Sequence, residues 1–163
     1  MSKDNEELKK LYEDDVKEKT DADWSNKEVM AKIDKNDRKR KKKVEKIMAE
    51  GGLKTAADYH HAALIFQHGG STVDYQKANE LAKKGMEMGD ERSRWLYAAT
   101  MDRWLVSQGK PQKYGTQFRK NKSGKWEMGQ VNPITTDEER VYLNVPPLSK
   151  ALAKFKEKYK NLD

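Results

Sequence analysis

The fold is decided by residues 74–108, which run DYQKANELAKKGMEMGDERSRWLYAATMDRWLVSQ. Apolar and small residues recur in this stretch at the three- and four-residue spacing of a helix face. An acidic residue opens each half, and a glycine, Gly89 or Gly109, follows each half, as helix dipoles and left-handed C-caps favour. The pattern predicts two antiparallel helices in close contact through small residues, namely Ala78, Ala82, Gly85, Ala98 and Ala99.

Helix signals also precede this pair. A sparse apolar stripe predicts a weakly packed helix over residues 5–19, and Ser25 with Glu28 forms a predicted capping box for a long helix that ends at Gly51. A third helix is expected from Thr55 or Asp58 to Gly69. We therefore expect residues 1–24 to form a lightly packed N-terminal helix and linker, and residues 25–163 to form the helical domain.

Strand-like residues follow the central pair. Residues 116–120 and 125–131 flank Asn121-Lys122-Ser123-Gly124, which predicts a two-stranded hairpin. Thr136 with Glu139 forms a capping box for a short helix, and a last helix is expected from about Leu148 to Tyr159. The predicted fold is a single compact, mainly α domain of five to seven helices with a small β-hairpin near residues 116–131.

Composition limits the class of protein. The 163 residues are 37% charged and 35% apolar, and they include no cysteine, which excludes disulfides and thiolate metal sites. The N-terminal region does not resemble a signal peptide, and no apolar run approaches the ~20 residues that a membrane span needs. We expect a cytoplasmic protein that does not enter a membrane.

Polar residues interrupt several apolar helix faces. Asp37 and Arg40 share a face with Ile33 and Val44, and Asp102 lies in the stripe that contains Trp95 and Leu105. His61 and His68 align with Asp58 on the third helix. A buried charge needs a partner, so these groups either converge on one site or form separate structural pairs. In the second case Asp37 pairs with Arg40, and Asp102 pairs with a nearby arginine or with loop N–H groups.

The loop Gly109-Lys110-Pro111-Gln112-Lys113-Tyr114-Gly115-Thr116-Gln117 is unusually rich in hydrogen-bonding groups. We expect it to cover a pocket for a small molecule or a peptide, with His68 as general acid or base and Asp102 as the residue that orients it. The residues expected to bind substrate are Asp37, Gln67, Arg103, Gln112, Tyr114, Thr116 and Gln117. A non-catalytic protein-interaction module is the alternative.

The histidine spacing argues against a metal site. His61 and His68 are seven residues apart, about 10.5 Å along a helix, whereas two ligands of one zinc ion each lie ~2 Å from it. A site of His68, Asp102 and Asp37 is conceivable but lacks a characteristic spacing. No metal and no cofactor are expected, and the sequence assigns no oligomeric state.

A basic run suggests a third function. Residues 25–50 hold ten Lys or Arg against five Asp or Glu, and six of the cations are consecutive, Arg38 to Lys43. Six consecutive cations cover every side of a helix, and no aromatic residue lies among them to stack on a base. This pattern favours at most non-specific nucleic-acid binding, and we expect no sequence-specific nucleic-acid partner.

Two resemblances accompany these motifs. Asp37, Gln67-His68, Asp102-Arg103 and the 109–117 loop together resemble a bacterial family known only as a domain of unknown function, over roughly residues 25–155. The resemblance implies a long helix with an inward Asp, a Gln-His pair that ends a helix, and a loop that closes over them. It implies no activity. Residues 74–108 also resemble one tetratricopeptide or Sel1-type unit, although stacked arrays need about three or more.

Overall fold

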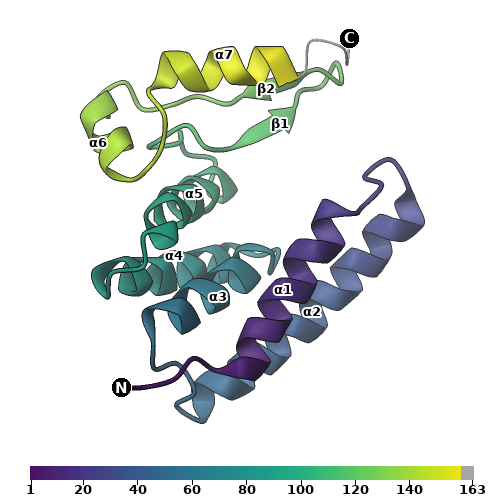
Figure 1. Ribbon diagram of the computed structural model, residues 1–163. Helices are drawn as coiled ribbons and strands as arrows, with labels where there is room; N and C mark the ends of the chain where they lie inside the picture. Colours follow the sequence, from purple (N-terminus) through teal and green to yellow (C-terminus); the bar gives the residue numbers. More distant parts are fainter. Residues whose placement is uncertain (159–163) are drawn as a thin grey trace.

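The computed structural model describes residues 1–158 and is mainly helical, with one two-stranded sheet (Figure 1). This confirms the predicted fold class. The elements are α1 (Glu6–Thr20), α2 (Lys27–Ala49), α3 (Ala56–Gln67), α4 (Thr72–Glu87), α5 (Arg92–Ser107), β1 (Phe118–Lys120), β2 (Trp126–Met128), α6 (Asp137–Tyr142) and α7 (Leu148–Lys158). Tyr159, the predicted end of the last helix, lies outside the described residues. No helix among those described is long and apolar enough to cross a membrane.

The elements form three groups along the chain (Figure 1). α1 and α2 lie side by side as a long hairpin, and α3, α4 and α5 pack consecutively beside it. The β-hairpin, α6 and α7 cover the end of this body beyond α5. Because α1 contacts both α2 and α3, and because its Leu8 and Leu11 are buried in the main core, α1 packs more fully than its sparse apolar stripe indicated.

Side-chain caps set the helix starts. Thr55 and Asp58 form a capping box at α3, and Thr136 and Glu139 form the predicted one at α6. At α2 the cap is Asn26 rather than Ser25, because the Asn26 side chain accepts the N–H groups of Glu28 and Val29. The predicted starts are therefore correct to within a residue at these helices.

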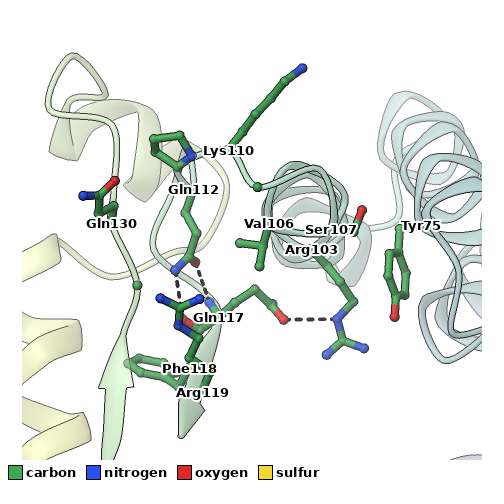
Figure 2. A pocket seen from close by; sticks show the side chains of 13 residues that line it. Tyr75, Arg103, Val106, Ser107, Lys110, Gln112, Gln117, Phe118, Arg119 and Gln130 are labelled. Carbon is green, nitrogen blue, oxygen red and sulfur yellow. Dashed lines mark hydrogen bonds between the residues drawn. The ribbon is translucent and has the colours of Figure 1, made fainter. Parts of the chain in front are cut away.

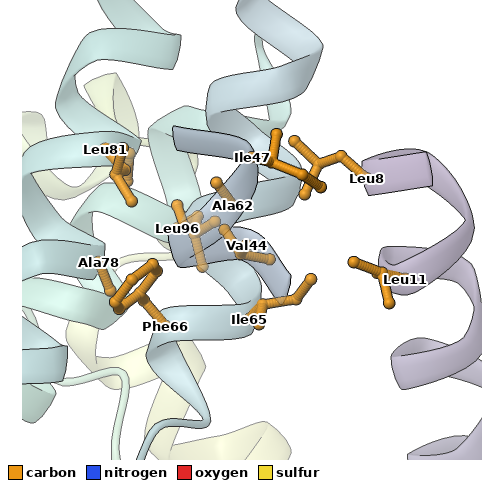
Figure 3. Packing of buried hydrophobic residues seen from close by; sticks show 12 residues of the cluster. Leu8, Leu11, Val44, Ile47, Ala62, Ile65, Phe66, Ala78, Leu81 and Leu96 are labelled. Atoms are coloured by element: carbon orange, nitrogen blue, oxygen red, sulfur yellow. The ribbon is translucent and has the colours of Figure 1, made fainter. Parts of the chain in front are cut away.

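Small residues allow the close packing of α3, α4 and α5. Ala78 and Ala82 of α4 and Ala98 and Ala99 of α5 are fully buried, as predicted. A Cβ at Gly85 of α4 would lie 2.6 Å from the hydroxyl of Ser93 of α5, so the close approach of these two helices requires glycine at position 85. The larger side chains of the core come from α1 to α5 (Figure 3): Leu8, Leu11, Val44, Ile47, Ile65, Phe66, Leu81 and Leu96. Trp95, which was expected in the core, is 44% exposed because Leu96 takes the inward position.

The β-hairpin is short and antiparallel, with Phe118 opposite Met128 and Lys120 opposite Trp126. Gly124 in its turn has φ +81°, the left-handed conformation that glycine adopts without strain. The Phe118 ring stacks on Phe155 of α7 at a centroid distance of 4.3 Å. This contact holds the hairpin against α7. Another part of the hairpin surface lies toward α5, where Phe118 and Arg119 share a groove with Arg103.

Candidate functional site

The 109–117 loop is held by one buried carboxylate. Asp102 of α5 has no exposed surface, and its Oδ1 accepts the N–H groups of Lys113 at 2.7 Å and Tyr114 at 2.9 Å. Its Oδ2 accepts the N–H of Thr116 at 2.9 Å and the Thr116 hydroxyl at 2.8 Å. Four donors therefore satisfy the buried charge. Of the partners that the sequence suggested for Asp102, which were His68, a nearby arginine and the loop N–H groups, the loop N–H groups are the ones observed.

A second set of bonds closes the loop on itself. The Gln112 side chain accepts the Gln117 N–H at 2.7 Å and donates to the Gln117 carbonyl at 2.9 Å. The Gln112 backbone N–H donates to the Gln130 carbonyl at 2.8 Å, so the loop is also tied to the segment that follows β2. Gly115 has φ +81°, and a Cβ there would lie 3.1 Å from Leu148. The loop is a rigid wall rather than a flexible lid.

A groove of about 490 Å³ lies between this wall, the hairpin and helices α4 and α5 (Figure 2). Its size is typical of small-molecule sites. Arg103 and Tyr75 line one end, while Phe118 and Arg119 line the hairpin side. The other lining residues are Val106, Ser107, Gly109, Lys110, Pro111, Gln112, Gln117, Gly129 and Gln130.

The groove is lined by cations and by no carboxylate among residues 1–158. Arg119 has a counter-ion, since its Nε lies 3.4 Å from a Glu127 oxygen. Arg103 has no counter-ion among residues 1–158: its Nε donates to the Gln117 side chain at 3.1 Å and its Nη1 to the Gln67 carbonyl at 2.9 Å. Burial lowers the pKa of Arg103 from its ordinary value, which reflects the cost of a desolvated charge without an anion beside it.

Tyr75 compensates Arg103 only in part. The guanidinium carbon lies 5.7 Å from the centre of the Tyr75 ring, within range of a cation–π interaction. Such a contact contributes less than a charged hydrogen bond to a carboxylate or phosphate. Arg103 is thus a cation held in place by neutral acceptors at the end of an open groove.

The predicted site residues separate into three places. Arg103, Gln112 and Gln117 line the groove. Gln67 reaches it only through its backbone carbonyl, and Thr116 lies behind the wall against Asp102. Tyr114 is 4% exposed and lines no part of the groove, and burial raises its pKa. Asp102 and Tyr114 are sealed inside the protein and do not reach a ligand in the groove.

His68 belongs to a different cluster. Its Nδ1 lies 2.9 Å from Asp15 of α1, so Asp15, and not Asp102, orients this imidazole. Lys19 donates to both Asp15 and Asp37 at 2.6 Å, and Arg40 donates to Asp37 at 2.6 Å. Burial opposes ionisation of Asp15, but the hydrogen bond and charge of His68, with Lys19, hold its pKa below the ordinary value. The predicted convergence of His68 with Asp102 is therefore wrong.

This second cluster has the ligand types of a metal site. One ligand atom each from Asp15, Asp37 and His68 lies within 4.8 Å of the others. The Lys19 ammonium, however, lies 2.6 Å from both carboxylates, where a metal ion would compete with it. Arg40 is a second cation on the same two acids. The cluster is best explained as a buried ion network that joins α1, α2 and the end of α3.

A serine, a histidine and an aspartate also meet at the start of α5. The Ser93 hydroxyl lies 3.2 Å and an Asp90 oxygen 3.8 Å from the same atom, Nδ1 of His60. A catalytic triad needs the serine and the acid on opposite ring nitrogens, and Ser93 has no exposed surface. Burial lowers the pKa of His60 to about 4, so the ring is neutral at neutral pH. This group is structural.

Several residues of these sites were not predicted. Tyr75, Phe118 and Arg119 carry no local signal for the groove, because the tertiary packing of α4 and the hairpin brings them to Arg103. One feature of the sequence could have indicated that Asp15 is buried: it follows Leu8 by seven residues and Leu11 by four, and therefore lies on the same helix face. Asp37 and Arg40 are buried on the apolar face of α2 and pair with each other, as expected.

Neither a family model, nor a curated protein sequence, nor a solved structure matches this chain. The resemblance to a family of unknown function stays a prediction.

Proposed function

We propose that the groove beside α5 binds a small molecule that carries a carboxylate or a phosphate group. The observation that supports this proposal is Arg103, a desolvated cation without a carboxylate partner among the described residues, at one end of a groove of about 490 Å³. An anionic ligand supplies the missing counter-ion. Its remaining atoms contact the Tyr75, Val106, Pro111 and Phe118 side chains.

Arg103 is held ready for such a ligand. Its Nε and Nη1 bond to Gln117 and Gln67, which fixes the plane of the guanidinium, while Nη2 has no hydrogen-bond acceptor within residues 1–158. A guanidinium that is already ordered loses little entropy when it binds an anion. Arg119 and Lys110 add positive potential along the groove.

Binding explains this groove better than acid–base catalysis does. Asp102 is occupied by four loop donors, and His68 is paired with Asp15 away from the groove. Among the described residues of the lining, Tyr75 is the only one besides the cations that has a titratable side chain. A peptide with an acidic side chain or terminus satisfies the same cation, so an interaction module remains the second candidate.

The test is titration of the protein with inorganic phosphate, succinate and phenyl phosphate, followed by NMR and calorimetry. We expect shifts of the Arg103, Gln117 and Phe118 signals, and tighter binding of phenyl phosphate than of phosphate. Arg103→Met removes the charge but keeps most of the side-chain length, so it should abolish binding of all three anions. Arg94→Gln, outside the groove lining, is the matched control.

Two results would contradict the proposal. One is binding of the three anions that survives Arg103→Met. The other is a set of shifted signals that map to the His68 and Asp15 cluster instead of the groove.

A further inference from the structure

The basic run of α2 is divided by the fold into inward and outward cations. Arg40 is buried and pairs with Asp37 and Glu18. Lys41 turns to α4, where its Nζ lies 3.0 Å from Asp74. The neighbouring cations of the run, Arg38, Lys39, Lys42 and Lys43, are exposed and form no ion pair within the described part of the chain. Two of six consecutive cations are therefore structural, and the other four are free.

The outward cations form a one-sided ridge. At 100° per residue, six lysines fall within about 100° of the helix circumference, centred roughly 120° from the buried Ile33, Val44 and Ile47. We call these six the basic ridge: Lys32, Lys35, Lys39, Lys42, Lys43 and Lys46. All six are exposed, and Lys46 alone has an ion pair in the described chain, at 3.9 Å from Glu50. The six consecutive cations do lie on every side of the helix, as expected, but because Arg40 and Lys41 pair inward, the exposed lysines form a defined face.

We infer that the basic ridge is a docking surface for the phosphate backbone of a nucleic-acid duplex, independent of sequence. The ridge runs from Lys32 to Lys46, fourteen residue steps or about 21 Å at 1.5 Å per residue. B-DNA carries one phosphate per ~1.7 Å of its axis, so this length of duplex holds roughly twelve phosphates around its whole circumference, of which the lysines can neutralise four or five.

The ridge chemistry favours a duplex over other polyanions. Single-strand binders stack bases on aromatic side chains, and none lies on this face of α2. Amphipathic helices that bind anionic membranes present large apolar residues beside the basic ones, whereas the apolar face of α2 is buried against α1 and α3. Lysines supply point charges without the bidentate geometry that reads a base, which predicts no sequence preference.

The test measures fluorescence anisotropy of labelled duplexes of about 20 base pairs, roughly two helical turns, in DNA and RNA form. The ridge variant changes Lys35, Lys39, Lys42 and Lys46 to Gln. The matched control changes Lys83, Lys84, Lys122 and Lys150 to Gln, which removes the same charge from exposed sites off α2. The control also loses a weak pair, because Lys83 lies 3.9 Å from Glu87. Gln preserves helix propensity, and circular dichroism verifies the fold.

We expect the wild type to lose roughly 150- to 500-fold in duplex affinity between 50 and 200 mM salt, as four or five phosphate contacts predict. The control should keep most of this salt dependence, and the ridge variant should lose most of it. DNA and RNA duplexes of unrelated sequences should bind within a few-fold of each other. If the ridge variant unfolds, the Lys39→Gln, Lys42→Gln pair gives the same comparison with half of the charge change.

Four outcomes would overturn the inference. They are equal weakening by the ridge and control variants, no binding at 50 mM salt, tighter binding of single-stranded DNA of the same length, and preferential binding to phosphatidylserine vesicles over duplex. Phosphate bound at the Arg103 groove does not affect these results, since none of the eight substitutions lies in its lining.

Discussion

Asp102 accepts two hydrogen bonds from a single residue, the backbone N–H and the hydroxyl of Thr116, at 2.9 and 2.8 Å. Because Asp102 lies on α5 and Thr116 is the next-to-last residue of the 109–117 loop, this pairing fixes the wall of the groove directly to the helix. The carboxylate has no cation among the partners that the described residues provide. The hydrogen-bond donors that stabilise this carboxylate are neutral, and all four come from residues 113–116.

Asp102→Asn should destabilise the fold and disorder the groove together. The amide retains one acceptor oxygen but turns an NH₂ group toward loop donors, so the free energy of unfolding should fall by roughly 2–3 kcal/mol. Urea denaturation measures this loss, and binding of phenyl phosphate should weaken in parallel. Asp14→Asn, on the exposed face of α1, is the control and should change neither. An Asp102→Asn protein of unchanged stability would mean that the loop does not depend on the carboxylate.

Tyr114 and Gly115 should respond in opposite ways to substitution. Tyr114→Phe removes the hydroxyl of a residue that holds Asp102 through its backbone N–H and lines no part of the groove, so stability should change by at most ~1 kcal/mol and ligand affinity should not change. Gly115→Val forces a branched side chain into a left-handed conformation beside Leu148 and Met128, and should cost roughly 3 kcal/mol.

Gly124 offers a matched control for the backbone strain. It has the same φ of +81°, but a Cβ there would contact nothing within 4 Å. Thermal unfolding of Gly124→Val therefore isolates the strain, and the additional loss in Gly115→Val reports the crowding. Equal effects of the two substitutions would show that the loop has room for a side chain.

Mild acid should destabilise the protein through His60. Burial holds the His60 pKa at about 4 in the folded state, against 6.5 when the group is unperturbed. The unfolded chain therefore binds the proton first, and stability falls as the pH decreases from about 6.5 to about 4, by up to about 3 kcal/mol. His61, whose pKa is also lowered by burial, contributes in the same direction.

Urea denaturation at intervals between pH 7.5 and 4.5 measures this slope. His60→Gln cannot take up a proton and should flatten the profile, even if it lowers stability at pH 7.5. A profile with the same slope in the variant would assign the effect to other groups.

Zinc should not change the melting temperature of the wild-type protein, because Lys19 lies between the carboxylates of Asp15 and Asp37. Lys19→Met removes that ammonium and leaves two carboxylates and His68 with ligand atoms within 4.8 Å of one another. In this variant we expect stoichiometric zinc to raise the melting temperature and a chelator to reverse the rise. Stabilisation of the wild type by zinc to the same extent would show that Lys19 does not block the site.

Sequence patterns predicted most of the elements but not how they meet. Helix periodicity, capping boxes and glycine stops depend on neighbouring residues, so the central pair, α6 and the hairpin were correct. The inward direction of Asp37 and Arg40 was also correct, because both lie on an apolar helix face. The acid that pairs with a buried cation or histidine is decided by how the helices pack, and neighbouring residues in the sequence do not indicate it. His68 pairs with Asp15, 53 positions away, and no local pattern indicated it.

The groove was predicted only from its loop. The hydrogen-bonding groups of residues 109–117 indicated a specified structure, and they were assigned to a ligand. Most of them instead satisfy Asp102 or one another, since a tight loop without regular backbone pairing must saturate its own N–H groups. Arg103 lines the groove, although not with His68 and Asp102 as predicted, because it neighbours Asp102 on the helix but points to a different side.

The N-terminal helix affects the order in which the chain can fold during synthesis. The Asn5 N–H donates to Asp58, and the His68 ring pairs with Asp15, each across 53 positions of sequence. A nascent chain that ends before α3 therefore exposes Leu8, Leu11 and Val44 together with charges that have only some of their partners. Residues up to His68 must therefore be synthesised before α1 has all of these partners, so α1 can pack on α2 early but completes its packing only after α3 has formed.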